Sequence, residues 1–511
     1  MTMDSFPDTP AYAALLARVH EIHDLEKAAA VLSWDRDVNM PRAGLTGRIQ
    51  QMTTLSRLIH SSFTSEEMGA LIESAATGLN GADYDTNAAA LIRVLRKSHA
   101  DATKLPTDYV TRRTAVSANA RSVWEKARAE NDFASFRPWL EQVVTLAQEA
   151  AELYGYQDDP YDALIDKYEA EARTDEVRHL FSALRESLVP LREAIAARGR
   201  KVDDRLLHQH FPIEGQQAFA RYVATAAGYD LERGHLGTVV HPFSISFGQD
   251  DVRITTRWYS DFISPSVFGT LHESGHAIYE QGTHPSLART PLARGASMGL
   301  HESQSRLFEN IVGRSLTFWQ AHFSRLKEIF PTQLGAHSAR DFHAAINKVE
   351  PSLIRVEADE LTYNLHIILR FELEQAMLKG DLLPADLPAA WRDGMQTLLG
   401  VTPMDDRTGC LQDVHWSSPS FGYFPTYALG NLYSAQIFET ALAQDVAIGA
   451  ELEAGRTGAL VSWLRENLHR HGKKYTPAEL VVRVTGKPLG HDAFVRYVTK
   501  KFVDLYGLST G

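Results

Sequence analysis

The sequence predicts a large, mainly α-helical protein that contains one small β-hairpin. Apolar residues recur at three- and four-residue spacing over most of the chain, and runs of β-branched residues are rare. Only one segment alternates apolar and polar residues with period two. With 511 residues, of which 44% are hydrophobic and 23% charged, the chain is long enough to bury a sizeable core.

The N-terminal half is predicted to consist almost entirely of amphipathic helices. Residues 11–199 are rich in Ala, Leu, Glu and Arg and keep the helical spacing. Breaks are expected at 39–41, 104–106 and 158–160, because each ends in a proline, which lacks a backbone donor and restrains its predecessor. We expect residues 1–235 to form an N-terminal helical part that is continuous with the rest of the chain.

The C-terminal part, residues 236–511, is expected to begin with the β element, at about 238–257. Two runs of alternating apolar and polar residues flank a polar turn at 248–250, which predicts a hairpin. On its second strand Asp251, Arg253 and Thr255 share one face. An acid, a base and a hydroxyl on one face indicate either a solvated sheet surface or part of a site.

Helical spacing resumes at Ser264, where serine followed by proline is typical of a helix start, and continues to a stop at Gly282. Residues 402–427 are rich in Gly, Pro, Ser and aromatic residues and are expected to form an ordered loop region, where sites are often assembled. Further helices are expected at about 297–330, 339–347, 351–379 and 431–506.

Composition excludes several classes of partner. With 52 Lys and Arg against 64 Asp and Glu and no basic block, the chain lacks the concentrated positive charge that nucleic acids or anionic membranes require. No stretch approaches the roughly 18 apolar residues of a membrane span. The single cysteine, Cys410, cannot form an intramolecular disulfide, and residues 1–11 lack the basic start and apolar core of a secretory signal. We therefore expect a cytoplasmic protein.

The strongest motif is His272-Glu273-Ser274-Gly275-His276, inside the helix that begins at Ser264. Histidines at i and i+4 lie on one helical face and can bind one metal ion, while Glu273 would lie beside the ion and could take a proton from water. Gly275 in mid-helix costs about 1 kcal/mol relative to alanine, which the close approach of another backbone or of a substrate would explain. Two purely structural histidines are the alternative.

A catalytic zinc ion normally has three protein ligands, so a third ligand is needed. Glu302 lies on the next expected helix, which can pack beside the first and bring its carboxylate to the histidines. Glu309 is one heptad further on the same face and competes for this role. Spacing alone does not choose between them, and a lone glutamate is more often a solvated charge.

These residues resemble the carboxypeptidase Taq family of metallocarboxypeptidases, which belongs to the zinc peptidases that have a His-Glu-x-x-His helix and a glutamate third ligand. The resemblance extends over the whole chain, whose length of about 500 residues also matches the family. The family's motifs occur in order as Asp-Val-Arg-Ile-Thr at 251–255, the motif at 272–276, His-Glu-Ser-Gln at 301–304, Ile-Arg-Val-Glu-Ala-Asp at 354–359 and Gly-Cys-Leu-Gln-Asp-Val-His-Trp at 409–416.

The resemblance implies His272, His276 and Glu302 as the ligands of one zinc ion (Zn2+) per chain, and the same ligand set also accepts cobalt. It implies Glu273 as the general base that activates water and then passes the proton to the leaving amine. It also implies a saddle-like helical fold with a deep active-site cleft beside the β element, and a homodimer.

Removal of C-terminal residues requires a cation that holds the terminal carboxylate, and a guanidinium can bind both of its oxygens. Arg355 is the first candidate, and Arg253 is the second, either for that carboxylate or for the substrate backbone. Arg355 could instead form an i,i+4 ion pair with Asp359 on a helix. The two interpretations are compatible if Asp359 orients the guanidinium.

Attack of water on the scissile carbonyl builds negative charge on its oxygen, so hydrogen-bond donors aimed at that oxygen are expected. His415 and Tyr423 are suited to this, by analogy with a histidine and a tyrosine in a later segment of related zinc peptidases. Aromatic packing is the alternative for Tyr423. Asp413 or Gln412 could orient a ligand histidine.

The expected function is that of a zinc-dependent metallocarboxypeptidase that releases single amino acids, with broad specificity, from peptides with a free C-terminus. One alternative is an oligopeptidase that cuts internal bonds with the same zinc site. The other is a non-catalytic helical binding protein.

Overall fold

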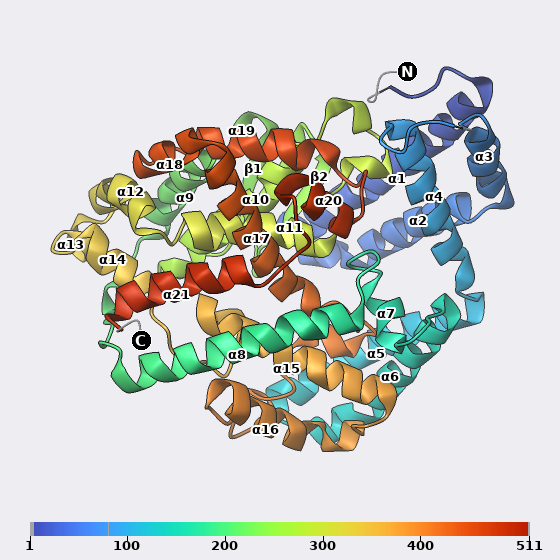
Figure 1. Ribbon diagram of the computed structural model, residues 1–511. Helices are drawn as coiled ribbons and strands as arrows, with labels where there is room; N and C mark the ends of the chain where they lie inside the picture. The colour runs from blue at the N-terminus through green and yellow to red at the C-terminus, as the bar shows by residue number, and fades with distance from the viewer. Residues whose placement is uncertain (1–4, 80, 509–511) are drawn as a thin grey trace.

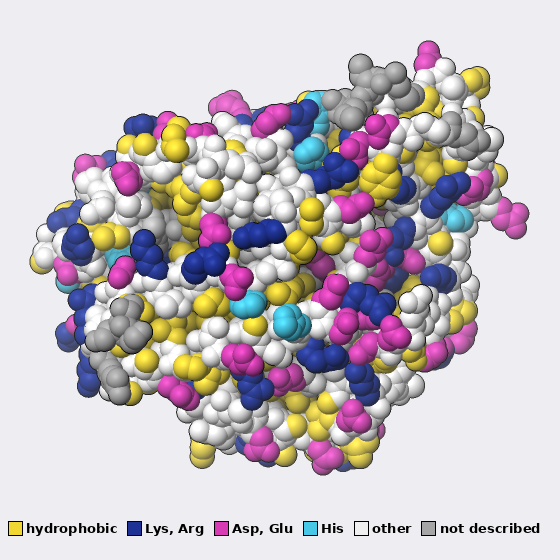
Figure 2. All heavy atoms as spheres, in the orientation of Figure 1, with side chains coloured by type: hydrophobic (Ala, Val, Ile, Leu, Met, Phe, Trp, Pro, Cys, Tyr) yellow, Lys and Arg dark blue, Asp and Glu magenta, His cyan; other side chains and the backbone are white. Residues whose placement is uncertain are grey.

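The computed structural model describes residues 5–79 and 81–508, and over this range the chain is mainly helical with one three-stranded sheet (Figure 1). The predicted fold class is confirmed. No helix in the described range is long and apolar enough to span a membrane. Residues 1–4, which belong to the N-terminal segment considered above, lie outside the described residues. On the face drawn in Figure 2, basic side chains are interspersed with acidic ones.

The N-terminal helices begin and end close to the predicted breaks. Helix α1 ends at Val38, α4 ends at Lys104, and α7 begins at Pro160 with its first turn capped by Asp159. The helices are α1 (Pro10–Val38), α2 (Leu45–Phe63), α3 (Glu66–Thr77), α4 (Asn87–Lys104), α5 (Thr107–Glu130), α6 (Phe133–Tyr154), α7 (Pro160–Ile165), α8 (Thr174–Arg198) and α9 (Ile213–Ala227).

The sheet has the strand order β1-β3-β2 and consists of β1 (Gly234–Thr238), β2 (Ser244–Gly248) and β3 (Asp251–Thr256). Strands β2 and β3 pair antiparallel and confirm the predicted hairpin. Strand β1 pairs parallel with β3 and was not predicted. Asp251 and Arg253 form an ion pair, whereas Thr255 is fully buried and hydrogen-bonds the backbone of Phe243, so the polar face of β3 is only partly solvated.

The C-terminal part returns to helices. Helix α10 spans the predicted residues from Ser264 to Gln281, and the long helix expected at 297–330 is interrupted by a π-helical turn, η6 (Leu307–Val312). The helices are α10 (Ser264–Gln281), α11 (Met298–Arg306), α12 (Leu316–Ile329), α13 (Pro331–Leu334), α14 (Ala339–Ile346), α15 (Glu360–Lys379), α16 (Leu387–Leu399), α17 (Pro425–Gln444), α18 (Val446–Glu453), α19 (Gly458–Asn467), α20 (Pro477–Thr485) and α21 (Asp492–Tyr506).

The helix predicted at 351–379 begins later than expected. Asp359 is the N-cap of α15, and its side chain accepts the backbone N–H groups of Leu361 and Thr362, each at 2.9 Å. Before it, the chain is irregular apart from one 3-10 turn, η7 (Arg355–Glu357). The prediction for 351–359 is therefore wrong, because a capping aspartate sets the helix start after the motif.

Two hydrophobic cores hold the molecule together. The larger core contains buried residues from Tyr109 to Tyr506 and includes side chains from both expected parts. The smaller core joins α1, α3 and α4 to Leu287 and Leu292, and these helices form one end of the molecule (Figure 1). The larger core thus spans both expected parts, and the division of the chain near residue 235 stays a prediction.

Candidate metal centre

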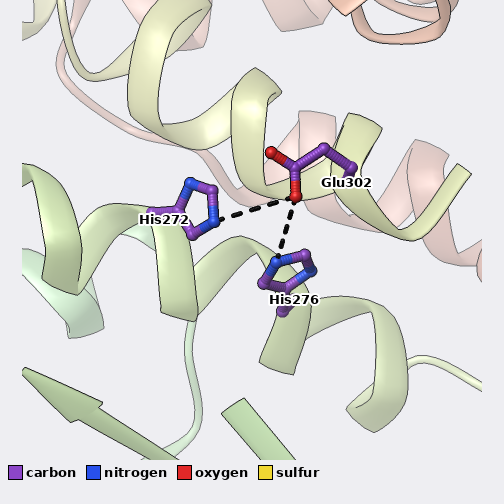
Figure 3. Close-up of side chains that lie close together, drawn as sticks. All are labelled: His272, His276 and Glu302. Atoms are coloured by element: carbon purple, nitrogen blue, oxygen red, sulfur yellow. Dashed lines mark ion pairs between the residues drawn. The ribbon is translucent and has the colours of Figure 1, made fainter. Parts of the chain in front are cut away.

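Three side chains on two adjacent helices converge at one point (Figure 3). The Nε2 atoms of His272 and His276 on α10 lie 3.9 and 3.6 Å from Oε2 of Glu302 on α11. The possible ligand atoms of the three residues all lie within 4.8 Å of one another, close enough to share one ion. Two imidazoles and one carboxylate form a typical three-ligand set for a catalytic metal, with one position left for water or substrate.

Close packing of α10 and α11 explains the mid-helix glycine of the motif. A Cβ atom at Gly275 would lie 2.3 Å from the carbonyl oxygen of Gln304 and 2.7 Å from Cα of Ser305. On the other side of α11, a Cβ atom at Gly430 of α17 would lie 2.7 Å from the Glu302 side chain. Glycine at both positions lets the helices approach until the three side chains meet.

The second ring nitrogen of each histidine is held by another side chain. Nδ1 of His272 lies 2.8 Å from Oε2 of Glu309, which belongs to the π-helical turn η6. Nδ1 of His276 lies 2.6 Å from Nδ1 of His301, whose Nε2 lies 2.8 Å from Glu280. Such partners fix the ring orientation of metal-binding histidines.

Glu309 therefore lies at the opposite edge of the His272 ring from Glu302, where it can orient the ring. The residues that the sequence offered for this role, Gln412 and Asp413, instead hydrogen-bond Arg355 and Arg370. That expectation is wrong, because it rested on proximity in a motif and not on the packing of α10 against η6.

The two oxygens of the Glu302 carboxylate contact different partners. Its Oε1 accepts a hydrogen bond of 2.7 Å from Nε of Arg306, one helical turn later, and its Oε2 faces the two histidines. The Arg306 guanidinium also lies 4.4 Å from the centre of the Tyr363 ring. Sequence reasoning missed Arg306, although its i,i+4 spacing from Glu302 is a recognisable signal.

Glu273 lies beside the three candidate metal ligands, and one of its carboxylate oxygens is available for a further hydrogen bond. Its side chain is buried, and Oε2 has no hydrogen-bond partner among the described residues. Burial raises the pKa of Glu273 to about 7, and the carboxylates of Glu302 and Glu309 add to this while His272 opposes it. A buried carboxylate with a free oxygen and a pKa near neutrality suits a general base.

Arg355 is buried within a second group of charges. Its Nη2 donates to Oδ1 of Asp413 at 2.8 Å and its Nη1 donates to the Tyr363 hydroxyl at 3.0 Å. Nε of Arg370 donates to Oδ2 of the same aspartate at 2.6 Å. Burial would raise the pKa of Asp413, but the two guanidinium groups hold it well below its usual value. The i,i+4 pair with Asp359, which was the alternative considered for Arg355, is not found among the ion pairs of the described residues, because Asp359 caps α15.

Arg253 lies elsewhere, on the sheet. It forms two hydrogen bonds of 2.8 Å with Asp251, and its guanidinium lies 4.4 Å from the centre of the Trp34 ring on α1. Among the described residues, the side-chain hydrogen bonds, ion pair and ring contacts of Arg253 involve Asp251, Trp34 and Phe247. None of them involves the three candidate metal ligands or Asp413.

His415 and Tyr423 lie together in the loop before α17, with ring centroids 5.5 Å apart. Burial lowers the pKa of His415 to about 4, and Arg355 and Arg370 contribute although Asp413 opposes them. Burial also raises the pKa of Tyr423. Both side chains are therefore neutral near pH 7 and can donate hydrogen bonds. Tyr423 also packs edge-on against Tyr427, so the expected aromatic contact is present as well.

Comparison with known proteins agrees with this geometry. Residues 14–502 match the family of carboxypeptidase Taq (M32) metallopeptidases. The chain is 42% identical to thermostable carboxypeptidase 1 of Thermus thermophilus over 97% of this chain and 99% of that protein, and 38% identical to carboxypeptidase 1 of Bacillus subtilis over 95% and 96%. The crystal structure of the M32 carboxypeptidase from Deinococcus radiodurans superposes with a TM-score of 0.93 at 37% identity, covering 98% of this chain and all of that one. The chain belongs to the carboxypeptidase Taq (M32) family of metallopeptidases.

Proposed function

We propose that this metallocarboxypeptidase releases single amino acids, with broad specificity, from peptides with a free C-terminus, and that it uses zinc. The observation that carries the proposal is the convergence of His272, His276 and Glu302 beside the open carboxylate of Glu273. A zinc ion held by these three ligands would supply a Lewis acid for the peptide carbonyl and for water.

Glu273 is the general base in this proposal. Its free Oε2 accepts a proton from the attacking water and then donates that proton to the nitrogen of the leaving amino acid. A pKa near 7 allows the same carboxyl to accept and release the proton at neutral pH.

His415 and Tyr423 are proposed as the donors to the carbonyl oxygen as charge develops on it. Both groups are neutral near pH 7, so each can donate a hydrogen bond without first losing or gaining a proton. Because the loop that carries them is mostly buried, these bonds would form in a poorly solvated environment, where they are strongest.

Arg355 is proposed to hold the terminal carboxylate of the peptide. Two buried guanidinium groups, Arg355 and Arg370, share the single carboxylate of Asp413, which leaves one positive charge in excess. A buried excess positive charge favours an anionic ligand, because an unbalanced charge is costly at low dielectric. Arg253, whose charge is already balanced by Asp251, is the second candidate.

The remaining expectations belong to the same proposal. The partners are peptides and not nucleic acids or membranes, the location is the cytoplasm, and the assembly is a homodimer. The acidic composition and the single cysteine support the first two, and the family resemblance supports the third.

One short peptide, prepared as the free acid and as the C-terminal amide, tests the proposal by mass spectrometry after incubation with zinc-loaded protein. We expect a ladder of single-residue losses from the free acid alone. Internal fragments from both forms would indicate an oligopeptidase. No cleavage of either form by protein that contains one zinc per chain would indicate a binding protein.

A further inference from the structure

We propose that Glu374 is a positioning residue, which fixes the loop segment 416–422 and thereby places His415 and Tyr423. This inference rests on the proposed roles of those two residues. Glu374 lies on α15, in no motif, and its side chain is fully buried.

Glu374 binds both ends of one loop segment. Its Oε1 accepts a hydrogen bond of 2.9 Å from Nε1 of Trp416, and its Oε2 accepts one of 3.1 Å from the backbone N–H of Gly422. Trp416 directly follows His415, and Gly422 directly precedes Tyr423. The two anchored residues are therefore the immediate neighbours of the two proposed oxyanion donors.

Helix α7 contacts Glu374 through a side chain and the Gly422 end of the segment through its backbone. Oε2 of Glu374 also accepts a hydrogen bond of 2.6 Å from the Tyr161 hydroxyl of α7. Gly422 has a φ of 90°, and a Cβ atom there would lie 2.7 Å from the backbone of Leu164 and Ile165 at the end of α7. The Gly422 end of the segment is thus pressed against α7 while Glu374 holds its N–H group.

Helix α15 holds the start of the loop as well. Arg370, one turn before Glu374, donates 2.6 and 2.9 Å hydrogen bonds to Asp413 and Gln412. Residues four apart lie on the same helical face, so one face of α15 anchors the loop at 412–413, at 416 and at 422. Helix α15 packs against α7 and α8 in the lower half of the molecule (Figure 1).

The geometry explains why a carboxylate occupies this position. Trp416 Nε1 and Gly422 N can only donate, so each needs its own acceptor oxygen on the side chain. Glutamine has the same shape but only one oxygen, so its NH2 group would face either the indole N–H or the backbone N–H. E374Q therefore loses one of the two anchors, whichever way the amide is turned.

The test is steady-state kinetics of the zinc-loaded E374Q variant on a free-acid peptide. We expect kcat to fall by about 10- to 100-fold, the effect of a small displacement of catalytic groups, with KM and zinc content unchanged. Y161F is the matched control, because it removes a donor to the same carboxylate but leaves both loop anchors in place. Its kcat should stay within about twofold of wild type.

An unchanged kcat in E374Q, or an equal fall of kcat in E374Q and Y161F, would overturn the inference, because the glutamate would then be only a structural acceptor. If E374Q does not fold, W416F replaces it; this change removes the Nε1 donor next to His415 together with part of the buried indole ring. The same fall in kcat at constant KM is expected, and an unchanged kcat contradicts the inference.

The Y423F and Y423F/E374Q variants separate this inference from the proposed function. If Glu374 acts through Tyr423 and His415, the double variant should lose less activity than the product of the two single losses. Independent, multiplying losses would overturn the inference alone. Wild-type protein that does not shorten the free-acid peptide would instead overturn the proposed function.

Discussion

The two sides of the site are built in different ways. On the metal side, His272 and His276 lie one turn apart on α10, so their spacing in the sequence sets their geometry, and the packing of α11 against α10 brings Glu302 to them. On the substrate side, Arg355 and the proposed donors His415 and Tyr423 lie on irregular segments that are held by buried charges of α15. The histidine pair is therefore encoded locally, whereas the substrate side depends on contacts between residues far apart in the sequence.

The largest expected effect is on the metal side. E273Q keeps the shape of the side chain but removes its basicity, so kcat should fall by about 100- to 10,000-fold, the usual contribution of general acid–base catalysis. Because Glu273 is not among the grouped ligands, zinc content measured by atomic absorption should stay at the wild-type level. Retained turnover would remove Glu273 from the mechanism.

The corresponding substitution on the substrate side is D413N, which should affect the fold as well as activity. It leaves Arg355 and Arg370 buried without their shared anion, and loss of one member of a buried ion group typically costs about 3–5 kcal/mol. Denaturant unfolding measures this loss. D203N, which breaks the exposed Asp203–Arg205 pair, is the control and should leave the free energy of unfolding nearly unchanged. Equal losses would show that the substrate side needs no buried anion.

A milder change tests the substrate side without removing charge. R355K keeps the positive charge but loses the proposed bidentate contact with the terminal carboxylate of the peptide. KM for free-acid peptides should therefore rise by about 10- to 100-fold, because this is the loss of affinity expected when one hydrogen bond to a charged group is removed. R253K is the matched control on the sheet, with little change expected. If R253K raises KM and R355K does not, Arg253 is the residue that holds the terminal carboxylate.

On the metal side the corresponding mild change is E309Q. Glu309 holds Nδ1 of His272, and loss of such a partner typically weakens metal binding by about 10- to 100-fold. Zinc affinity, measured by competition with a chromophoric chelator, should fall, while kcat at saturating zinc changes little. An unchanged affinity would mean that α10 alone sets the ring orientation.

The difference between the two sides also decided what the sequence could predict. Helical spacing predicted α10 from Ser264 to Gln281 and the convergence of both histidines, since that geometry depends only on helix periodicity. It failed for the start of α15, where Asp359 caps the helix, and it could not find Arg370 or Glu374. These two residues contact partners about 40 positions away, so no local spacing signals them.

The smallest expected effect concerns protons on the substrate side. The pKa of His415 is lowered to about 4 by burial and by Arg355 and Arg370, against an ordinary value of about 6.5. As the pH falls from 6.5 towards 4, the unfolded chain binds this proton and the folded chain does not. The free energy of unfolding therefore decreases over this range, and the contribution of His415 to it is complete only above pH 6.5.

The free energy of unfolding of wild type minus that of H415Q should therefore fall by about 2 kcal/mol between pH 7 and pH 4.5. The metal-side histidines titrate equally in both proteins, and their contribution cancels in this difference. Urea unfolding at constant zinc measures it. A difference that does not change with pH would mean that His415 takes up its proton normally in the folded state, and that water reaches the loop held by α15.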